Sequence, residues 1–195
     1  PMSIDIATGR TVVITIVFTD IIAFSKAANS RQMAMKTHLN AIVGEAVAEI
    51  SNDDRVILDT GDGLAVALLG NPEDALFIAM KIRDGVARAE GDAAQTLRIG
   101  LHLGPVRIVR DLNNQPNVIG DGMNVAQRIM SFADPGEILV SRAYFEVVAR
   151  LREGNNDLFR YLGVKHDKHV QEHQIYSLGK AASVAGDGGE VELAV

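Results

Sequence analysis

Apolar residues follow two different spacings along the chain, and each spacing predicts a different kind of element. Short, nearly continuous apolar runs that are rich in β-branched residues are typical of strands buried on both faces. The clearest run, at residues 12–18, predicts a central strand. Later runs that predict strands lie at 56–58, 64–69, 97–109, 137–141, 158–164 and 173–178. Within 97–109, Gly104-Pro105 is expected to break the strand.

Apolar residues at helical spacing predict four helices. Their periodic residues span 35–50, 75–86, 122–132 and 142–151. Ser30 is expected to cap the first helix. Asn71 and Pro72 supply a cap and a first-turn proline for the second. The third helix is expected to bury Val125, Ile129 and Phe132.

The order of these elements predicts the fold class. Residues 59–63 contain Asp-Gly between two strand runs and predict a hairpin, whereas the turn-rich residues 111–117 predict a loop. Strand–helix–strand–strand–helix–strand order predicts an α+β sandwich of the ferredoxin-like or palm type. We expect a largely antiparallel sheet, helices packed on one face and extra C-terminal strands. This domain is assigned to residues 11–178, with an extension at 1–10 and a mobile tail at 179–195.

Composition narrows the class of protein. With 19 Lys and Arg against 25 Asp and Glu, the 195-residue chain has a net charge of −6, which argues against a nucleic-acid partner. The absence of cysteine excludes disulfides, thiolate zinc sites and cysteine nucleophiles. The apolar stretch near the N-terminus is too short to cross a bilayer. We therefore expect a cytoplasmic domain with no membrane contact of its own. Pro1 before Met2 indicates a piece of a longer protein, which leaves room for a regulatory domain or an anchor elsewhere.

The first candidate for chemistry is a pair of aspartates. Asp20 continues the apolar row of residues 14, 16 and 18 to the end of the first strand, where an unpaired carboxylate is costly to bury. Asp62 lies at the predicted hairpin tip, which the expected strand order brings beside that end. Two close carboxylates require a proton or a cation, and Mg²⁺ suits them. Taken singly, each has a simpler explanation, Asp20 as a helix cap and Asp62 as a turn residue.

The second candidate is a pair of polar residues on the third predicted helix. Asn124 and Arg128 are spaced i and i+4, so they project from one side of it. An amide and a guanidinium held together could bind a ribose oxygen and a phosphate. An ordinary solvated helix face is the alternative explanation.

Four short segments that contain these residues resemble the class III nucleotidyl cyclase catalytic domain, in the family's order and spacing. They are Phe18-Thr19-Asp20-Ile21, Thr60-Gly61-Asp62-Gly63, 99–106 and 120–128. The resemblance implies that ATP or GTP closes on itself with two Mg²⁺ or Mn²⁺ ions as cofactors. Asp20, Asp62 and the backbone carbonyl of Ile21 would hold the metals, and one ion would lower the pKa of the ribose 3′-hydroxyl that attacks the α-phosphorus.

The resemblance also assigns roles on the opposite side of the site. Asn124 would orient the ribose and Arg128 would stabilise charge at the α-phosphate. The family's phosphate-binding lysine falls on Lys168, with Lys165 as a rival. The two halves of each site would come from opposite subunits of a head-to-tail homodimer.

Two positions that read the purine depart from the family pattern. Leu58 stands where adenylate cyclases usually carry Lys and guanylate cyclases Glu, and Asn117 stands where Asp is usual for adenine. The Asn amide could pair with either base, whereas Leu58 can only pack. Neighbouring Asp59 could replace the missing polar group only through a one-residue slip, which would turn it to the other face. We expect ATP as the substrate, with GTP as the alternative.

Other interpretations compete with a cyclase. A catalytically silent nucleotide-binding or dimerisation module would keep the fold, and a palm-like nucleotidyl transferase would leave Asn124 and Arg128 without a role. His166, His169 and His173 with Asp167 match no helix-borne zinc motif. His102, inside an apolar strand, is expected to be a hydrogen-bonded core residue.

Overall fold

The computed structural model describes residues 10–167 and 170–179. Nearly all of the extension and the tail that the sequence predicts at 1–10 and 179–195 therefore lies outside the described residues. The strands are β1 (Thr11–Ile21), β2 (Arg55–Asp59), β3 (Gly63–Leu68), β4 (Leu97–Arg110), β5 (Pro116–Ile119), β6 (Ile138–Ser141), β7 (Phe159–His166) and β8 (Glu172–Leu178). The α-helices are α1 (Asn29–Ala46), α2 (Pro72–Val86), α3 (Asp121–Ser131) and α4 (Arg142–Val148).

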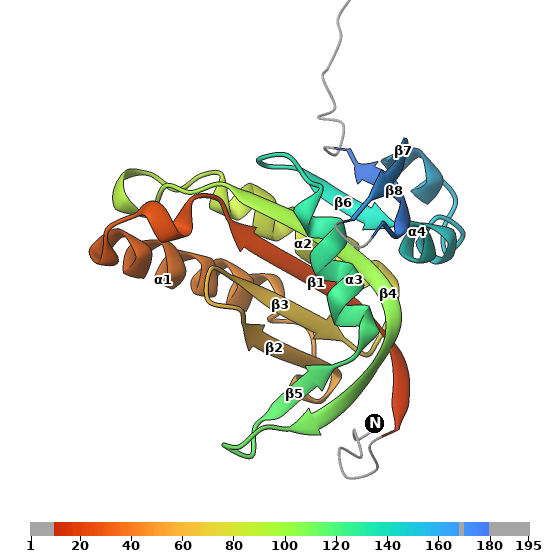
Figure 1. Ribbon diagram of the computed structural model, residues 1–195, viewed down its shortest axis with the longest axis horizontal. Helices are drawn as coiled ribbons and strands as arrows, with labels where there is room; N and C mark the ends of the chain where they lie inside the picture. The colour runs from red at the N-terminus through yellow and green to blue at the C-terminus, as the bar shows by residue number, and fades with distance from the viewer. Residues whose placement is uncertain (1–9, 168–169, 180–195) are drawn as a thin grey trace, which may run out of the picture.

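The strands form one sheet whose order is β2-β3-β1-β4-β6-β8-β7, with β5 paired to β4 (Figure 1). All pairs are antiparallel except β4 with β6. The first strand lies in the middle, between the hairpin strand β3 and the strand that follows the second helix, β4. The predicted α+β class and largely antiparallel sheet are confirmed.

The two faces of the sheet are covered by different helices. Val17 and Ile21 of β1 belong to a core cluster with residues of α1, α2 and α4. Ile14, Ile16 and Phe18, on the other face, form a cluster with residues of α3. Figure 1 accordingly shows α3 in front of the sheet and α2 behind it. The prediction that the helices share one face holds for α1, α2 and α4 and is wrong for α3.

Three local predictions also need correction. Ser30 does not cap α1, because the helix begins at Asn29 after Ala28 and no side chain caps it. Strand β4 continues unbroken through Gly104-Pro105. On the edge away from β1, β4 pairs with β6 only at 99–101 and with β5 only at 107–110. Pro105, which has no N–H to donate, is tolerated between these two pairings. The predicted loop at 111–117 ends early, because Pro116 begins β5 and Val118 is buried against the sheet.

Helix α3 approaches the sheet closely because β4 carries a glycine beneath it. A Cβ atom on Gly100 would lie 2.4 Å from the backbone nitrogen of Met130. The buried stripe of α3 consists of Gly122, Ala126, Ile129 and Met130. Of the three residues expected to be buried, only Ile129 is fully buried, and Val125 and Phe132 are partly so.

None of the helices within 10–167 and 170–179 combines the length and the apolar character needed to cross a membrane.

Candidate active site

The two aspartates are brought together by the backbone ladder between β1 and the β2–β3 hairpin. Asp20 lies opposite Gly63 in the register of β1 and β3. The Ile21 N–H donates a hydrogen bond to the backbone carbonyl of Asp62 at 2.8 Å, which ties the hairpin tip to the end of β1. Gly63 permits this approach, since a Cβ there would lie 1.9 Å from the Thr19 carbonyl oxygen. The positive φ of Gly61, 89°, closes the turn.

The environment of Asp20 makes its carboxylate costly to ionise. The residue is only 8% exposed, and burial raises its pKa. Arg98 opposes this effect, whereas the charge of Asp62 and a side-chain hydrogen bond between the two carboxyl groups raise the pKa further. The net result is a pKa above the ordinary aspartate value. A bound cation would remove this penalty, because it favours both carboxylates in their ionised form.

Arg98 is a site residue that sequence reasoning missed. It lies directly opposite Asp20 in the register of β1 and β4. Its Nε donates to Asp20 Oδ2 at 3.0 Å, and its Nη2 donates to the same oxygen. The signal in the sequence is an arginine within the apolar run that becomes β4. That signal identifies a partner for Asp20 only once the register is known.

The predicted amide and guanidinium lie on α3. Asn124 is exposed. Arg128 is held by the turn between β7 and β8: its Nε lies 3.1 Å from Asp167 Oδ2, and its Nη1 donates to Gln171 Oε1 at 2.6 Å. Asn124 is thus open to solvent, whereas Arg128 is anchored by the turn between β7 and β8.

Both predicted pairs line one cleft of a single chain. The cleft has a volume of about 710 Å³ and includes Asp20, Asp62, Asn124 and Arg128 in its wall. Arg98 lines it as well. The cleft therefore combines two carboxylates able to hold cations with an amide and two guanidinium groups able to hold phosphate and sugar oxygens.

The purine-reading positions do not line this cleft. Leu58, on β2, is partly buried against the α3-side core, and Asn117 lies on β5. The Asn117 Oδ1 accepts a hydrogen bond from the Val118 N–H at 2.7 Å. The slip that would exchange Leu58 for Asp59 does not occur, because Asp59 is paired with Leu64.

Asp59 instead braces the hairpin. Lys36 Nζ on α1 lies 2.9 Å from Asp59 Oδ1 and donates to the Gly63 carbonyl at 2.8 Å. The Gly61 N–H donates to the same carboxylate at 2.7 Å. Burial alone would raise the pKa of Asp59, but the hydrogen bonds from Lys36 and Gly61 lower it below the ordinary value. Asp59 thus stays ionised beside the turn that carries Asp62.

Two lysines, Lys168 and Lys165, are the candidates from the sequence for binding phosphate. Lys168 lies outside the described residues. Its rival Lys165 is exposed on β7, opposite His173 in the β7–β8 ladder.

His102, His166 and His173 each pair with another side chain. His102 is buried, and its Nδ1 lies 2.8 Å from Ser141 Oγ, which confirms the predicted hydrogen-bonded core position. Burial lowers the pKa of His102 to about 4. His166 pairs with Glu172 and His173 with Asp167, while His169 lies outside the described residues. Within the part of the chain that the structure describes, no three His, Cys, Asp or Glu residues gather as metal ligands.

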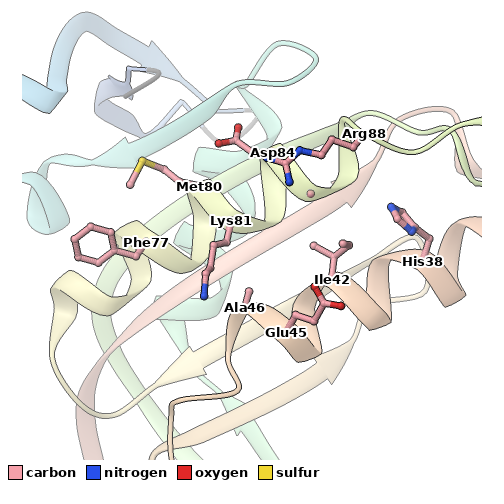
Figure 2. A pocket seen from close by; sticks show the side chains of 10 residues that line it. His38, Ile42, Glu45, Ala46, Phe77, Met80, Lys81, Asp84 and Arg88 are labelled. Carbon is pink, nitrogen blue, oxygen red and sulfur yellow. The ribbon is translucent and has the colours of Figure 1, made fainter. Parts of the chain in front are cut away.

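A second cleft of about 680 Å³ lies between α1 and α2. Figure 2 shows the Lys81 side chain of α2 reaching toward Ala46 on α1, with Ile42 on the same helix. None of the predicted site residues lines this groove, whose carboxylates are those of Glu45 on α1 and Asp84 on α2. The cleft beside α3 is therefore the candidate active site.

The fold is that of a nucleotide cyclase catalytic domain. The chain belongs to the family described as "Adenylate and Guanylate cyclase catalytic domain", whose model matches residues 6–173. Over 98 residues it is 34% identical to a protein of Rhizobium meliloti (strain 1021) described as "Putative adenylate cyclase 3". That match covers 48% of this chain and 16% of the relative's length. Members of the family are lyases that form cyclic nucleotides.

Solved structures share the fold. The guanylyl cyclase domain of a RhoGC fusion protein from Blastocladiella emersonii is 22% identical, with a TM-score of 0.71 over 87% of this chain and 97% of the other. The guanylate cyclase domain of RhGC from Catenaria anguillulae, solved with GTP, is 21% identical, with a TM-score of 0.71 over 87% and 98%. The adenylyl cyclase CyaB from P. aeruginosa is 18% identical, with a TM-score of 0.70 over 89% and 97%.

Proposed function

We propose that this chain converts ATP to 3′,5′-cyclic AMP and pyrophosphate for intracellular signalling. The observation that carries the proposal is the cleft in which Asp20 and Asp62 lie together, with Asn124 and Arg128 in the same wall. Separately, each residue has an ordinary structural explanation. Together they supply the cation ligands, the ribose ligand and the phosphate ligand that a nucleotide substrate requires.

The donor set fits two Mg²⁺ or Mn²⁺ ions. Magnesium takes one or two carboxylates and fills its other positions with water and phosphate oxygens. Asp20 and Asp62 would supply these carboxylates and the Ile21 carbonyl a further oxygen. Burial and, less strongly, the neighbouring Asp62 raise the pKa of Asp20 even with Arg98 present, so a bound cation would stabilise the ionised pair. When bound, the cations would lower the pKa of the ribose 3′-hydroxyl and neutralise triphosphate charge.

The side chains of the protein would position the nucleotide and compensate the charge that develops. Asn124, exposed on α3, would orient the ribose so that its 3′-oxygen faces the α-phosphorus. Arg128 would donate hydrogen bonds to the α-phosphate oxygens as negative charge builds there. Arg98 would become available to phosphate oxygens once cations take over the neutralisation of Asp20. Lys168 or Lys165 would provide a further phosphate contact.

We further propose a head-to-tail homodimer in which each site combines the acids of one subunit with Asn124 and Arg128 of the other. Each nucleotide would then lie between two chains, and each chain's cleft would contribute one half to each of two sites. Exposed apolar side chains on several strands offer area for such an interface. They include Val13 on β1, Ile57 on β2 and Ile119 on β5, which are 65%, 41% and 50% exposed. The guanylyl cyclase domain from B. emersonii is described as a dimer.

GTP is the alternative substrate, because the Asn117 amide suits guanine as well as adenine. The Asn117 Oδ1 is already occupied by the Val118 N–H, which leaves the amide N–H₂ to donate. A donor suits the guanine carbonyl as well as it suits a ring nitrogen of adenine. Leu58 contributes packing to either base.

The deciding experiment is product analysis. The purified protein is incubated with ATP or with GTP and Mn²⁺, and the products are separated and identified. Cyclic AMP, together with its loss in Asp62→Asn, is the expected result. Cyclic GMP would support the alternative substrate. Absence of both products from a folded, dimeric protein would overturn the proposal in favour of a silent nucleotide-binding module.

A further inference from the structure

The turn between β7 and β8 contains an aspartate that is unusually buried for its position. The Asp167 side chain is only 5% exposed. Its Oδ1 accepts a hydrogen bond from the Gln171 N–H at 3.0 Å. Its Oδ2 lies 3.1 Å from Arg128 Nε and 3.3 Å from His173 Nε2. The Asp167 N–H donates to the Gln171 carbonyl at 3.1 Å, so the backbone of this residue is held within the same turn.

The same turn holds the guanidinium of Arg128 at two points. Asp167 takes Nε, and the Gln171 side chain takes Nη1 at 2.6 Å. A guanidinium has five N–H donors in a rigid fork, so two fixed hydrogen bonds set its plane and leave donors for another ligand. Arg128 is 26% exposed, and both it and Asp167 line the candidate active site.

An arginine side chain without such an anchor would lose conformational freedom when it binds a phosphate. The buried carboxylate removes most of that cost in advance, because the Arg128 fork is already fixed at the edge of the cleft. Asp167 is a carboxylate, so it cannot itself bind the phosphates of an anionic substrate without a cation. Its contact with Arg128 gives it a route to the phosphate, because the guanidinium that it holds lines the same cleft.

We propose that Asp167 is a positioning residue for Arg128 and that Gln171 assists it. The turn between β7 and β8 thereby orients the guanidinium whose remaining N–H groups meet the α-phosphate. This inference rests on the proposed cyclase activity. It assigns the two turn residues to the same functional half of the site as Asn124 and Arg128, and to the opposite half from Asp20 and Asp62.

The first test is the steady-state kinetics of Asp167→Asn, which keeps the shape of the side chain and removes its charge. We expect kcat to fall about 10-fold or more with KM for the nucleotide changed less than about 3-fold, because a misaligned fork costs transition-state contacts most. Gln171→Met, at an exposed position, should lower kcat about 3-fold in the same manner. Glu172→Gln, at the first residue of β8, is the matched control, since the Glu172 side chain is 73% exposed and pairs with His166 instead.

The second test separates a positioning role from a loss of folding. Asp167→Asn mixed with Asp20→Ala should recover to about a quarter of wild-type activity, because each mixed dimer holds one intact site. Asp167→Asn mixed with Arg128→Ala should show no recovery above its own residual rate. Thermal melts confirm that each variant is folded, and Gln171→Met gives the kinetic answer if Asp167→Asn is not.

Unchanged or increased kcat in folded Asp167→Asn and Gln171→Met would overturn the inference, and an increase would identify Asp167 as a competitor of the phosphate. Recovery of Asp167→Asn by Arg128→Ala would also overturn it. These outcomes differ from failure of the proposed function. In that case, the wild-type protein would form no cyclic nucleotide, or Asp20→Ala with Arg128→Ala would not recover.

Discussion

The two ends of the candidate active site are built in different ways. At the acidic end, Asp20 and Asp62 are placed by backbone hydrogen bonds between β1 and the hairpin. At the arginine end, Asn124 and Arg128 project from α3, and Arg128 is held by side chains of a turn. A backbone ladder is supported by every pair along the strand, whereas the orientation of a long side chain depends on a few contacts. Substitutions should therefore act through the backbone at one end and through side-chain contacts at the other.

The largest expected effect comes from removing one group at each end. Asp20→Ala and Arg128→Ala should each lower the cyclase rate by about 1,000-fold, because each removes several kcal/mol of transition-state stabilisation. In a shared-site dimer, a mixture of the two should recover about a quarter of wild-type activity. The measurement is cyclic nucleotide formation before and after the two proteins are mixed.

The control for this experiment is a mixture of Asp20→Ala with Asp62→Ala. Both substitutions lie at the acidic end, so no combination of these chains holds an intact pair of acids, and no recovery is expected. If Asp20→Ala with Arg128→Ala also fails to recover although mixed dimers form, the two ends act within one chain. That outcome would fit the cleft that both ends line in a single chain.

The second prediction tests whether the backbone alone places the acidic end. Gly63→Ala would put a Cβ 1.9 Å from the Thr19 carbonyl oxygen, so the hairpin has to move away from β1. We expect about a 100-fold loss of activity and a lower Tm, although no catalytic group is changed. Gly70→Ala is the matched control, because a Cβ there would meet no atom within 4 Å. Equal activity of the two variants would contradict placement by the backbone.

Much of the fold could be predicted because strand and helix periodicity is local. The apolar parity of β1 correctly led from Phe18 to Asp20, and the Asp-Gly pair located the hairpin. Periodicity does not show which face of a sheet a helix covers, since β1 is apolar on both faces, and α3 was therefore misplaced. Strand β5 was missed because Pro116-Asn117 is typical of a turn, and its strand conformation depends on pairing with β4.

The candidate site could be predicted only as far as its residues lie in short motifs. Asp20, Asp62, Asn124 and Arg128 belong to segments with a recognisable order. Arg98 depends on the register between β1 and β4, which long-range pairing sets. The contact of Asp167 with Arg128 depends on how closely the β7–β8 turn approaches α3. Neither the register nor this approach leaves a local signal in the sequence.

The third prediction concerns the pH dependence of stability that arises from the buried histidine beneath α3. His102 lies in β4 below the start of α3, and burial lowers its pKa from 6.5 to about 4. The unfolded chain therefore binds a proton on this residue near pH 6.5, while the folded chain does so only near pH 4. The stability from neutral His102 is present above pH 6.5 and is lost as the pH falls. This loss is about 2–3 kcal/mol between pH 7.5 and 4.5.

Urea unfolding of wild type and His102→Asn across this pH range measures the effect. Other groups titrate in both proteins, so the informative quantity is the difference between their free energies of unfolding. The wild type should be the more stable protein at pH 7.5, and its advantage should shrink by about 2–3 kcal/mol at pH 4.5. Parallel stability curves would show that His102 is not buried in its neutral form.

The smallest expected effect tests the side-chain brace at the acidic end. Lys36→Met removes the contacts of Nζ with Asp59 and with the Gly63 carbonyl. Asp59 is 60% exposed, so the free energy of unfolding should fall by less than about 1 kcal/mol. The hairpin tip keeps its ladder, so activity at saturating Mn²⁺ should stay within about 2-fold, whereas the Mn²⁺ concentration for half activity should rise about 3-fold.

The control is Lys81→Met, because Lys81 is an exposed lysine of the α1–α2 groove. If Lys36→Met lowered activity at saturating metal as strongly as Gly63→Ala, side-chain contacts would place the acids too, and the contrast between the two ends would be wrong.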